Sequence, residues 1–220
     1  TVGGVLAAAD ALTLPAVGRS LFVGNGVAWI GGEGSFQGGF MSVSVANPAD
    51  IALLSGIDDT ALAGRAIALN GSGLGVVVGN PGGAFGTRVL DVVRTGDATN
   101  TGAFVSRYSL PGVPDDVRIA GGMAYVAAGA AGLVVVNYTG FDNLGVAPTV
   151  SISADAADAD PATAGIQVVE GHSIRVRPSV TDDVQIRSLE LLVNGNVVAS
   201  DSSFPYELSA LAPLLASGGS

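Results

Sequence analysis

The stretch GMAYVAAGAAGLVVV, residues 122–136, contains two short apolar runs separated by a turn of small residues. Each run is rich in Val and too short for most helices, which is typical of β-strands. The same order of a short run, a glycine-containing turn and a second run occurs twice earlier, at residues 26–45 and 73–92. We therefore expect three antiparallel β units in the first two-thirds of the chain.

The three units recur at a spacing in the mid-forties. Gly39, Gly86 and Gly132 are 47 and 46 positions apart. This spacing is the length of a four-stranded propeller blade. Fourth strands are predicted at residues 51–57 and 103–110, and the third unit lacks one.

The predicted blades span about residues 18–63, 64–112 and 113–145, within a repeat region of residues 1–146. Three blades are too few to close a ring, because propellers need about four to eight. We expect an open arc of stacked sheets with exposed edges. Residues 1–14 are predicted to form the outer strand of a preceding blade.

The third unit also resembles a known family. The order Asp116-Val117, GMAYVA at residues 122–127 and GLVVV at residues 132–136 is similar to the LVIVD-type bacterial β-propeller repeat. The second unit departs from that pattern, because Val76 stands where the family has an aromatic residue. The resemblance covers residues 18–138. It implies a propeller fold and an exported setting, and such repeats carry no shared catalytic residues.

A second all-β module is expected over residues 147–220, after a linker that contains Gly, Pro and Asn. Strands are predicted at residues 149–153, 171–180 and 186–193 from their apolar and β-branched content. Residues 171–180 alternate, with apolar side chains on one face and two arginines facing out. Asn194-Gly195, between two apolar runs, is the strongest short hairpin signal.

This module resembles the bacterial Ig-like modules of exported adhesins and polysaccharide-degrading enzymes. The resemblance is carried by PTV at residues 148–150, VEG at 169–171, TDD at 181–183, SLELLVNG at 188–195 and FPY at 204–206. Two further strands are expected in that family, and the last residues of the chain are not predicted to supply them. The predicted fold class is all-β: about three incomplete propeller blades followed by a truncated Ig-like β-sandwich.

Charge and composition exclude several classes of function. The formal net charge is −10, and all nine cationic residues are Arg. A basic track for phosphates is missing, so no nucleic-acid partner is expected. The chain has no Cys, which excludes disulfides, thiolate zinc sites and cysteine nucleophiles. No run of 18 apolar residues is present, so no membrane span is expected.

No residue is predicted to be catalytic. His172, the only histidine, follows Glu170-Gly171 and is interpreted as a surface turn residue and not as a catalytic base. The glycine-rich residues 71–75 lack both a following helix and a Lys, so turn glycines explain them better than a phosphate site. The pairs Asp58-Asp59 and Asp115-Asp116 lie at strand boundaries, where acidic turn residues are common. We expect a protein that is not an enzyme and has no cofactor other than calcium.

A calcium site is predicted near the start of the second module. Calcium prefers six to eight oxygens, which carboxylates and carbonyls on loops supply. The predicted ligands are Asp155, Asp158, Asp160, Glu170, Asp182 and Asp183. A solvated acidic loop is the alternative for the same residues.

The leading interpretation is a non-enzymatic binding or structural segment of a larger exported bacterial protein, extracellular or at the cell surface. The expected partner is a protein or a carbohydrate at that surface. The alternative is an accessory region of a large secreted hydrolase whose catalytic domain lies outside this chain. A third hypothesis is that a complete propeller binds a small ligand or metal in its central channel. Fold alone does not separate these, because propellers have many functions.

Overall fold

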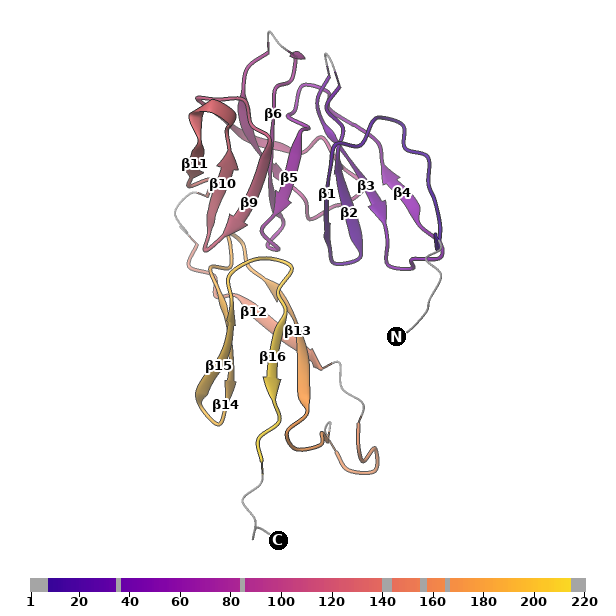
Figure 1. The fold of residues 1–220 in the computed structure, drawn as a ribbon, viewed down its shortest axis with the longest axis vertical. Helices are drawn as coiled ribbons and strands as arrows, with labels where there is room; N and C mark the ends of the chain where they lie inside the picture. Colours follow the sequence, from indigo (N-terminus) through magenta and orange to yellow (C-terminus); the bar gives the residue numbers. More distant parts are fainter. Residues whose placement is uncertain are drawn as a thin grey trace.

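The chain is all-β in its computed structural model, and the predicted fold class is confirmed at that level. The structure describes residues 8–34, 37–83, 86–139, 144–154, 158–164 and 167–214. These residues form strands, turns and one short 3-10 helix at Gly129–Ala131, without an α-helix. The strands make five separate sheets, none of which closes into a barrel. Three sheets lie side by side in the upper part of Figure 1, and two lie in the lower part.

The three upper sheets are antiparallel meanders, in which each strand pairs with the next strand in sequence. The first sheet contains β1 (Ser20–Gly24), β2 (Val27–Gly31), β3 (Phe40–Ser44) and β4 (Ala52–Ser55). The second sheet contains β5 (Ala66–Leu69), β6 (Leu74–Gly79), β7 (Val89–Arg94) and β8 (Phe104–Ser109). The third sheet contains β9 (Asp116–Ala120), β10 (Met123–Ala127) and β11 (Leu133–Val136). These strands confirm the positions predicted from the repeats, including both fourth strands.

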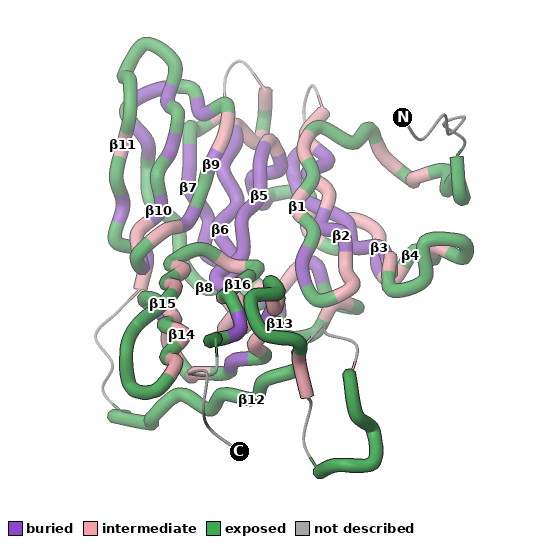
Figure 2. Tube along the Cα trace, turned by 60° about the horizontal axis from the view of Figure 1, so that its bottom comes forward, coloured by how far each residue is buried: buried purple, intermediate pink, exposed green. Residues whose placement is uncertain are grey.

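The second sheet is packed between the other two. Its first strand, β5, contacts both β1 and β9, the first strands of the neighbouring sheets. Every residue of β5 is buried, and β6 and β7 are buried except at one end. Figure 2 shows β5, β6 and β7 of this sheet as the main buried body, with exposed residues at β4 and β11. A strand buried on both faces needs a continuous apolar run, as VVV at residues 76–78 provides.

Two hydrophobic cores hold the three sheets together. The core between the first and second sheets includes Trp29, Phe40 and Val77. The core between the second and third sheets includes Leu90 and Val126. Each large side chain fully removed from water contributes about 1.5–3 kcal/mol to stability. Apolar side chains packed between the faces of neighbouring sheets are therefore the main interaction that holds the three sheets together.

The glycine spacing does not mark the same structural position in all three units. Gly39 and Gly132 directly precede the third strand of their sheets, whereas Gly86 lies in the loop before Val89, where β7 begins. Loops tolerate insertions, so loop length and glycine position vary while strand pairing is kept.

The sequence predicted an outer strand over residues 1–14, of which residues 1–7 lie outside the described part of the chain, and residues 8–14 do not form a strand. They lie beside the first sheet without pairing as a strand, and Asp10 Oδ2 accepts a hydrogen bond of 2.9 Å from the backbone N–H of Ile51. Two such backbone hydrogen bonds, from Ile51 and Ala11, lower the pKa of Asp10. A side chain here replaces the backbone ladder that a strand would make.

The lower part contains two sheets. One has the order β12 (Thr149–Ala154), β13 (Ser173–Thr181) and β16 (Leu208–Leu211), and the other is the hairpin of β14 (Leu189–Val193) and β15 (Asn196–Asp201). Their shared core contains Val180, Ile186 and Tyr206. Burial alternates along β13 as predicted, with the apolar positions turned inward. Asn194 and Gly195 have φ of 51° and 81°, the left-handed values that a two-residue hairpin turn requires.

Strand β16 corrects the prediction that the last residues supply no strand. Leu208–Leu211 pairs antiparallel with β13, from Val176 opposite Leu208 to Ser173 opposite Leu211. Four residues with little β-propensity gave no local signal. The edge of β13 supplies the hydrogen-bond partners that make them a strand.

One buried ion pair ties β7 to β8. The carboxylate of Asp91 is fully buried, and Arg107 donates to it through Nε at 2.6 Å and Nη2 at 2.8 Å. The backbone N–H of Ala63 donates a third hydrogen bond to Asp91 at 2.8 Å. The Asp91 carboxylate raises the pKa of Arg107, mainly through this hydrogen bonding. These three hydrogen bonds offset the free-energy cost of burying the negative charge of Asp91.

Arg107→Ala is expected to lower the free energy of unfolding by about 2–3 kcal/mol, because it leaves the buried Asp91 charge without its main partner. This is somewhat less than the ~3–5 kcal/mol of a fully buried pair, since Arg107 is partly exposed to water. Urea denaturation measures the change. The control is Arg118→Ala, which breaks the exposed pair with Asp116 and should change stability little. Equal effects of the two substitutions would contradict this account.

Candidate functional site

The lower module meets the upper sheets at a junction formed by equivalent turns. The turn between the first and second strands lies at the same end of each sheet, at Asn25-Gly26, residues 70–73 and Gly121-Gly122. Figure 1 shows these turns facing the lower module. Gly71 has a φ of 80°, a left-handed conformation that side-chain-bearing residues rarely adopt. The repeats therefore present three tight turns to one partner surface.

Phe204 is the central side chain of the junction. It lies in the loop between β15 and β16, and its ring stacks on Phe22 with centroids 6.0 Å apart and planes at 22°. A Cβ placed on Gly24 would lie 2.5 Å from the Phe204 ring, and one on Gly71 would lie 2.6 Å from it. On the other side, the ring of Tyr206 meets Phe204 edge to face at 5.9 Å. The absence of side chains at two turn glycines thus creates the space that Phe204 fills.

Hydrogen bonds fix the junction on both sides of Phe204. Asn70 Nδ2 donates to the backbone carbonyl of Val184 at 3.2 Å. Ser203 Oγ donates to the carbonyl of Ile119 at 2.7 Å. The backbone N–H of Gly121 donates to the carbonyl of Ser202 at 3.1 Å. Contacts to the second and third sheets together define one orientation of the module.

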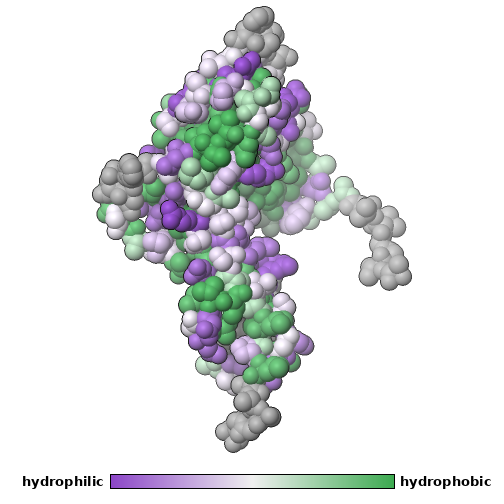
Figure 3. All heavy atoms as spheres, turned by 60° about the vertical axis from the view of Figure 1, so that its left-hand side comes forward, coloured by the Kyte–Doolittle hydropathy of each residue, from purple (hydrophilic) through white to green (hydrophobic). Residues whose placement is uncertain are grey.

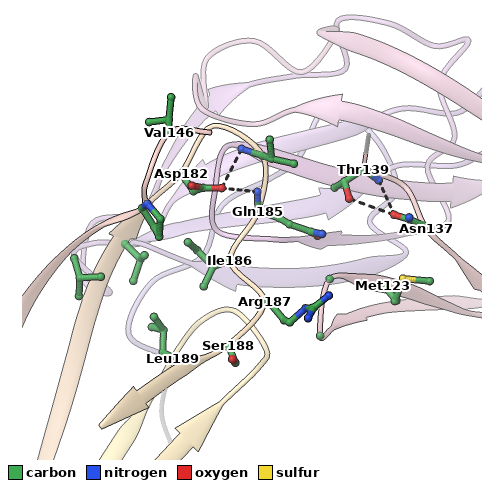
Figure 4. A pocket seen from close by; sticks show the side chains of 16 residues that line it. Met123, Asn137, Thr139, Val146, Asp182, Gln185, Ile186, Arg187, Ser188 and Leu189 are labelled. Carbon is green, nitrogen blue, oxygen red and sulfur yellow. Dashed lines mark hydrogen bonds between the residues drawn. The ribbon is translucent and has the colours of Figure 1, made fainter. Parts of the chain in front are cut away.

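A hollow of about 450 Å³ opens beside these contacts. Figure 4 shows Gln185 and Arg187 extending from the β13–β14 loop toward the side formed by Met123, Asn137 and Thr139. The wall is about half polar in character, with amide, hydroxyl and guanidinium groups beside apolar side chains. Such a surface can hydrogen-bond a polar ligand.

Asp182 shapes the loop that lines this hollow. Its Oδ2 accepts hydrogen bonds from the backbone N–H groups of Val184 at 3.1 Å and Gln185 at 2.8 Å. The Gln185 side chain is pressed against Gly122, and its Oε1 is buried with no hydrogen-bond partner within the described residues. A buried acceptor without a partner is costly.

Two buried tyrosines lie close to the junction. Burial raises the pKa of Tyr138 to about 12. Burial is also the main cause that raises the pKa of Tyr206 to about 12, followed by the charges of Tyr138 and Asp201. The hydroxyl of Tyr206 donates a long hydrogen bond of 3.3 Å to the carbonyl of Ile186. Both hydroxyls are therefore neutral over the whole physiological range.

The predicted calcium ligands that the structure describes are spread over several parts of the second module. Glu170 precedes β13 and Asp182 follows it, so these two lie at opposite ends of that strand. Asp158 accepts hydrogen bonds from the N–H groups of Asp160 and Gln167, as in a loop that its own carboxylates stabilise. No group of three or more His, Asp or Glu that could hold a metal occurs in the described residues.

Asp183 is exposed next to Asp182, and Asp155 lies outside the described residues. Calcium binding therefore stays a prediction from the sequence. His172 is exposed, and its backbone bonds to Val169 and Ala212 place it in a turn before β13.

Sequence reasoning missed the residues that build the junction. Phe204 was noted only as part of the FPY pattern at residues 204–206, and Asn70 was not predicted to contact the second module. The available signal was the recurrence of glycine-rich turns at the same place in each repeat. Recurring glycines indicate that another segment of the chain comes close to these turns, but they do not identify that segment.

Comparison with known proteins defines the lower module. Residues 148–219 match the family described as Bacterial Ig domain. The LVIVD repeat family gave no match for the upper sheets. No curated protein matches the chain. Within the described residues, no helix is long and apolar enough to cross a membrane. The match indicates a surface or binding module of a larger protein.

Gly24→Ala is expected to loosen the junction, because the new methyl group would overlap the Phe204 ring. The control is Gly96→Ala, which lies near the junction but has open space around its Cα. The chain has no Cys, so spin labels on Ser109→Cys and Ser200→Cys report the distance between the two parts without interference. We expect a broadened distance distribution for Gly24→Ala and an unchanged one for Gly96→Ala. A narrow distribution in both would show that Phe204 does not set the orientation.

Alkaline pH is expected to destabilise the protein between about pH 10 and 12. The folded pKa of Tyr138 and Tyr206, about 12, exceeds the ordinary value of 10.0. The stabilisation by these neutral hydroxyls is therefore full below pH 10 and is lost as the pH rises toward 12. Tyr206→Phe should reduce this loss while changing stability little at pH 7. Unfolding by urea at pH 7, 10 and 11.5 tests this, and an equal loss in Tyr206→Phe would contradict it.

Proposed function

We propose that the chain is a non-enzymatic contact segment of a larger exported bacterial protein, which binds a protein or a carbohydrate at the cell surface. The observation that carries the proposal is the junction: an Ig-type module matched over residues 148–219 is docked on the repeat sheets through Phe204. Modules held in one orientation form a composite surface that neither part has alone.

The upper sheets are, in this proposal, blades of a propeller-type repeat. Three consecutive meanders pack face to face, and their first strands lie in contact in sequence order. This is the arrangement of neighbouring blades in a propeller. Three sheets are fewer than the about four to eight blades of a closed ring.

The proposed binding surface is the hollow beside the junction. Arg187 and Ser188 come from the Ig-type module, while Asn137 comes from the repeat sheets. Guanidinium, hydroxyl and amide groups beside apolar walls suit the hydroxyls and ring faces of sugars as well as peptide groups. The buried, unpartnered Oε1 of Gln185 adds an acceptor for a ligand donor.

A panel of bacterial surface polysaccharides and extracellular-matrix proteins, immobilised on biosensors, tests this proposal. We expect the chain to bind at least one member and Arg187→Ala to weaken that binding about tenfold, equivalent to ~1.4 kcal/mol. Arg175→Ala, which removes an outward-facing arginine of β13, is the control and should bind as the wild type does.

Three outcomes would contradict the proposal: no binding to any member, equal effects of the two substitutions, or turnover of a panel member that His172→Ala abolishes. The alternative, an accessory region of a secreted hydrolase, shares the same local chemistry. The full-length reading frame separates the two, because only the hydrolase has a catalytic domain elsewhere in the chain.

A further inference from the structure

The outer face of the third sheet is apolar and uncovered. Its outward residues include Tyr125 on β10 and Leu133 and Val135 on β11, all exposed. Figure 3 brings this side of the molecule forward, and an apolar patch lies in its upper half. β9 carries two charges on this face, Arg118 and Asp116, and they pair with each other at 2.9 Å. Covering this face would therefore leave no new charge without a partner.

Strand register shows that the same positions are covered in the other two sheets. In the third sheet, Leu133 lies opposite Ala127. The equivalent residue is Phe40 in the first sheet, opposite Gly31, and Leu90 in the second sheet, opposite Val78. Phe40 is 0% exposed and Leu90 is 1% exposed, whereas Leu133 is 67% exposed. The following sheet buries the first two of these side chains. Leu133 thus occupies a position that the fold otherwise buries under another sheet.

The first sheet has the complementary uncovered face. Judged from the pairing with the second strands, Leu21 on β1 occupies the position of Ile67 on β5 and of Val117 on β9. By the same register, Val23 occupies the position of Leu69 and Ile119. Ile67 and Val117 are each 1% exposed because the preceding sheet covers them, whereas Leu21 is 63% exposed. The two ends of the stack therefore carry the two halves of one interface.

The internal contacts define how these halves fit. β5 packs against β1 and β2, and β9 packs against β5 and β6. The first strand of each sheet thus lies against the first two strands of the sheet before it. By the same geometry, a β1 strand fits against β9 and β10. The residues of β1, SLFVG, carry no charge that would have to be desolvated.

We propose that the third sheet of one chain docks on the first sheet of a second copy, so that the sheet stack continues from molecule to molecule. Leu133, Val135 and Tyr125 of one copy cover Leu21 and Val23 of the next. Such an interface joins two different surfaces, so association is head to tail and extends beyond a dimer. The interface between copies repeats the one already present between the sheets of each chain.

Sedimentation velocity over a hundredfold range of concentration tests the proposal. The average mass should rise with concentration above the 21.6 kDa of one chain. Leu133→Asp removes one half of the interface and Leu21→Asp removes the other, so each variant alone should remain monomeric. The control is Leu192→Asp on β14, a comparably exposed apolar residue of the other module, which should associate as the wild type does.

Mixing the two variants gives the decisive result. Leu133→Asp keeps an intact first sheet, and Leu21→Asp keeps an intact third sheet, so the mixture should form a one-to-one dimer and nothing larger. Circular dichroism melting confirms that each variant is folded. A wild-type chain that stays monomeric would overturn the proposal and leave another sheet-bearing chain segment as the occupant. Association that survives in both variants, or a mixture that stays monomeric, would also overturn it.

Discussion

The burial of β5, β6 and β7 on both faces is the constraint on which the rest of this structure depends. Val76 and Val78 face the third sheet while Val77 faces the first, so one strand contributes to two cores. The buried carboxylate of Asp91 on β7 is compatible with this environment because hydrogen-bond donors surround it. The outer sheets have one packed face each, which leaves apolar positions uncovered at both ends of the stack.

Tight turns at one end of the sheets give the second constraint. A glycine at Gly24 and another at Gly71 leave room for Phe204, and that single ring brings Phe22 and Tyr206 into one cluster. Hydrogen bonds from Asn70 and Ser203 then fix the rotation of the module about this cluster. The hollow beside the junction exists because both parts are held at a set distance.

The strands were largely predictable, and the junction was not. Runs such as GLGVVVG at residues 73–79 carry their secondary structure in local composition and glycine turns, so their strands appear where expected. The spacing of the aligned glycines was a less exact guide, because Gly86 lies in the loop before β7 whereas Gly39 and Gly132 directly precede strands. β16 was missed, because its hydrogen-bond partners belong to β13, far away in the sequence.

The sequence by itself determined the all-β class, the repeat of strand units, the hairpin at Asn194-Gly195 and the inward face of β13. These properties depend on neighbours within a few residues, through side-chain alternation and the φ values that Asn and Gly accept. Only the tertiary structure decided which strand faces are covered, that Phe204 lies over Gly24 and Gly71, and that Glu170 and Asp182 lie far apart. Those features depend on contacts between distant segments, which local composition does not encode.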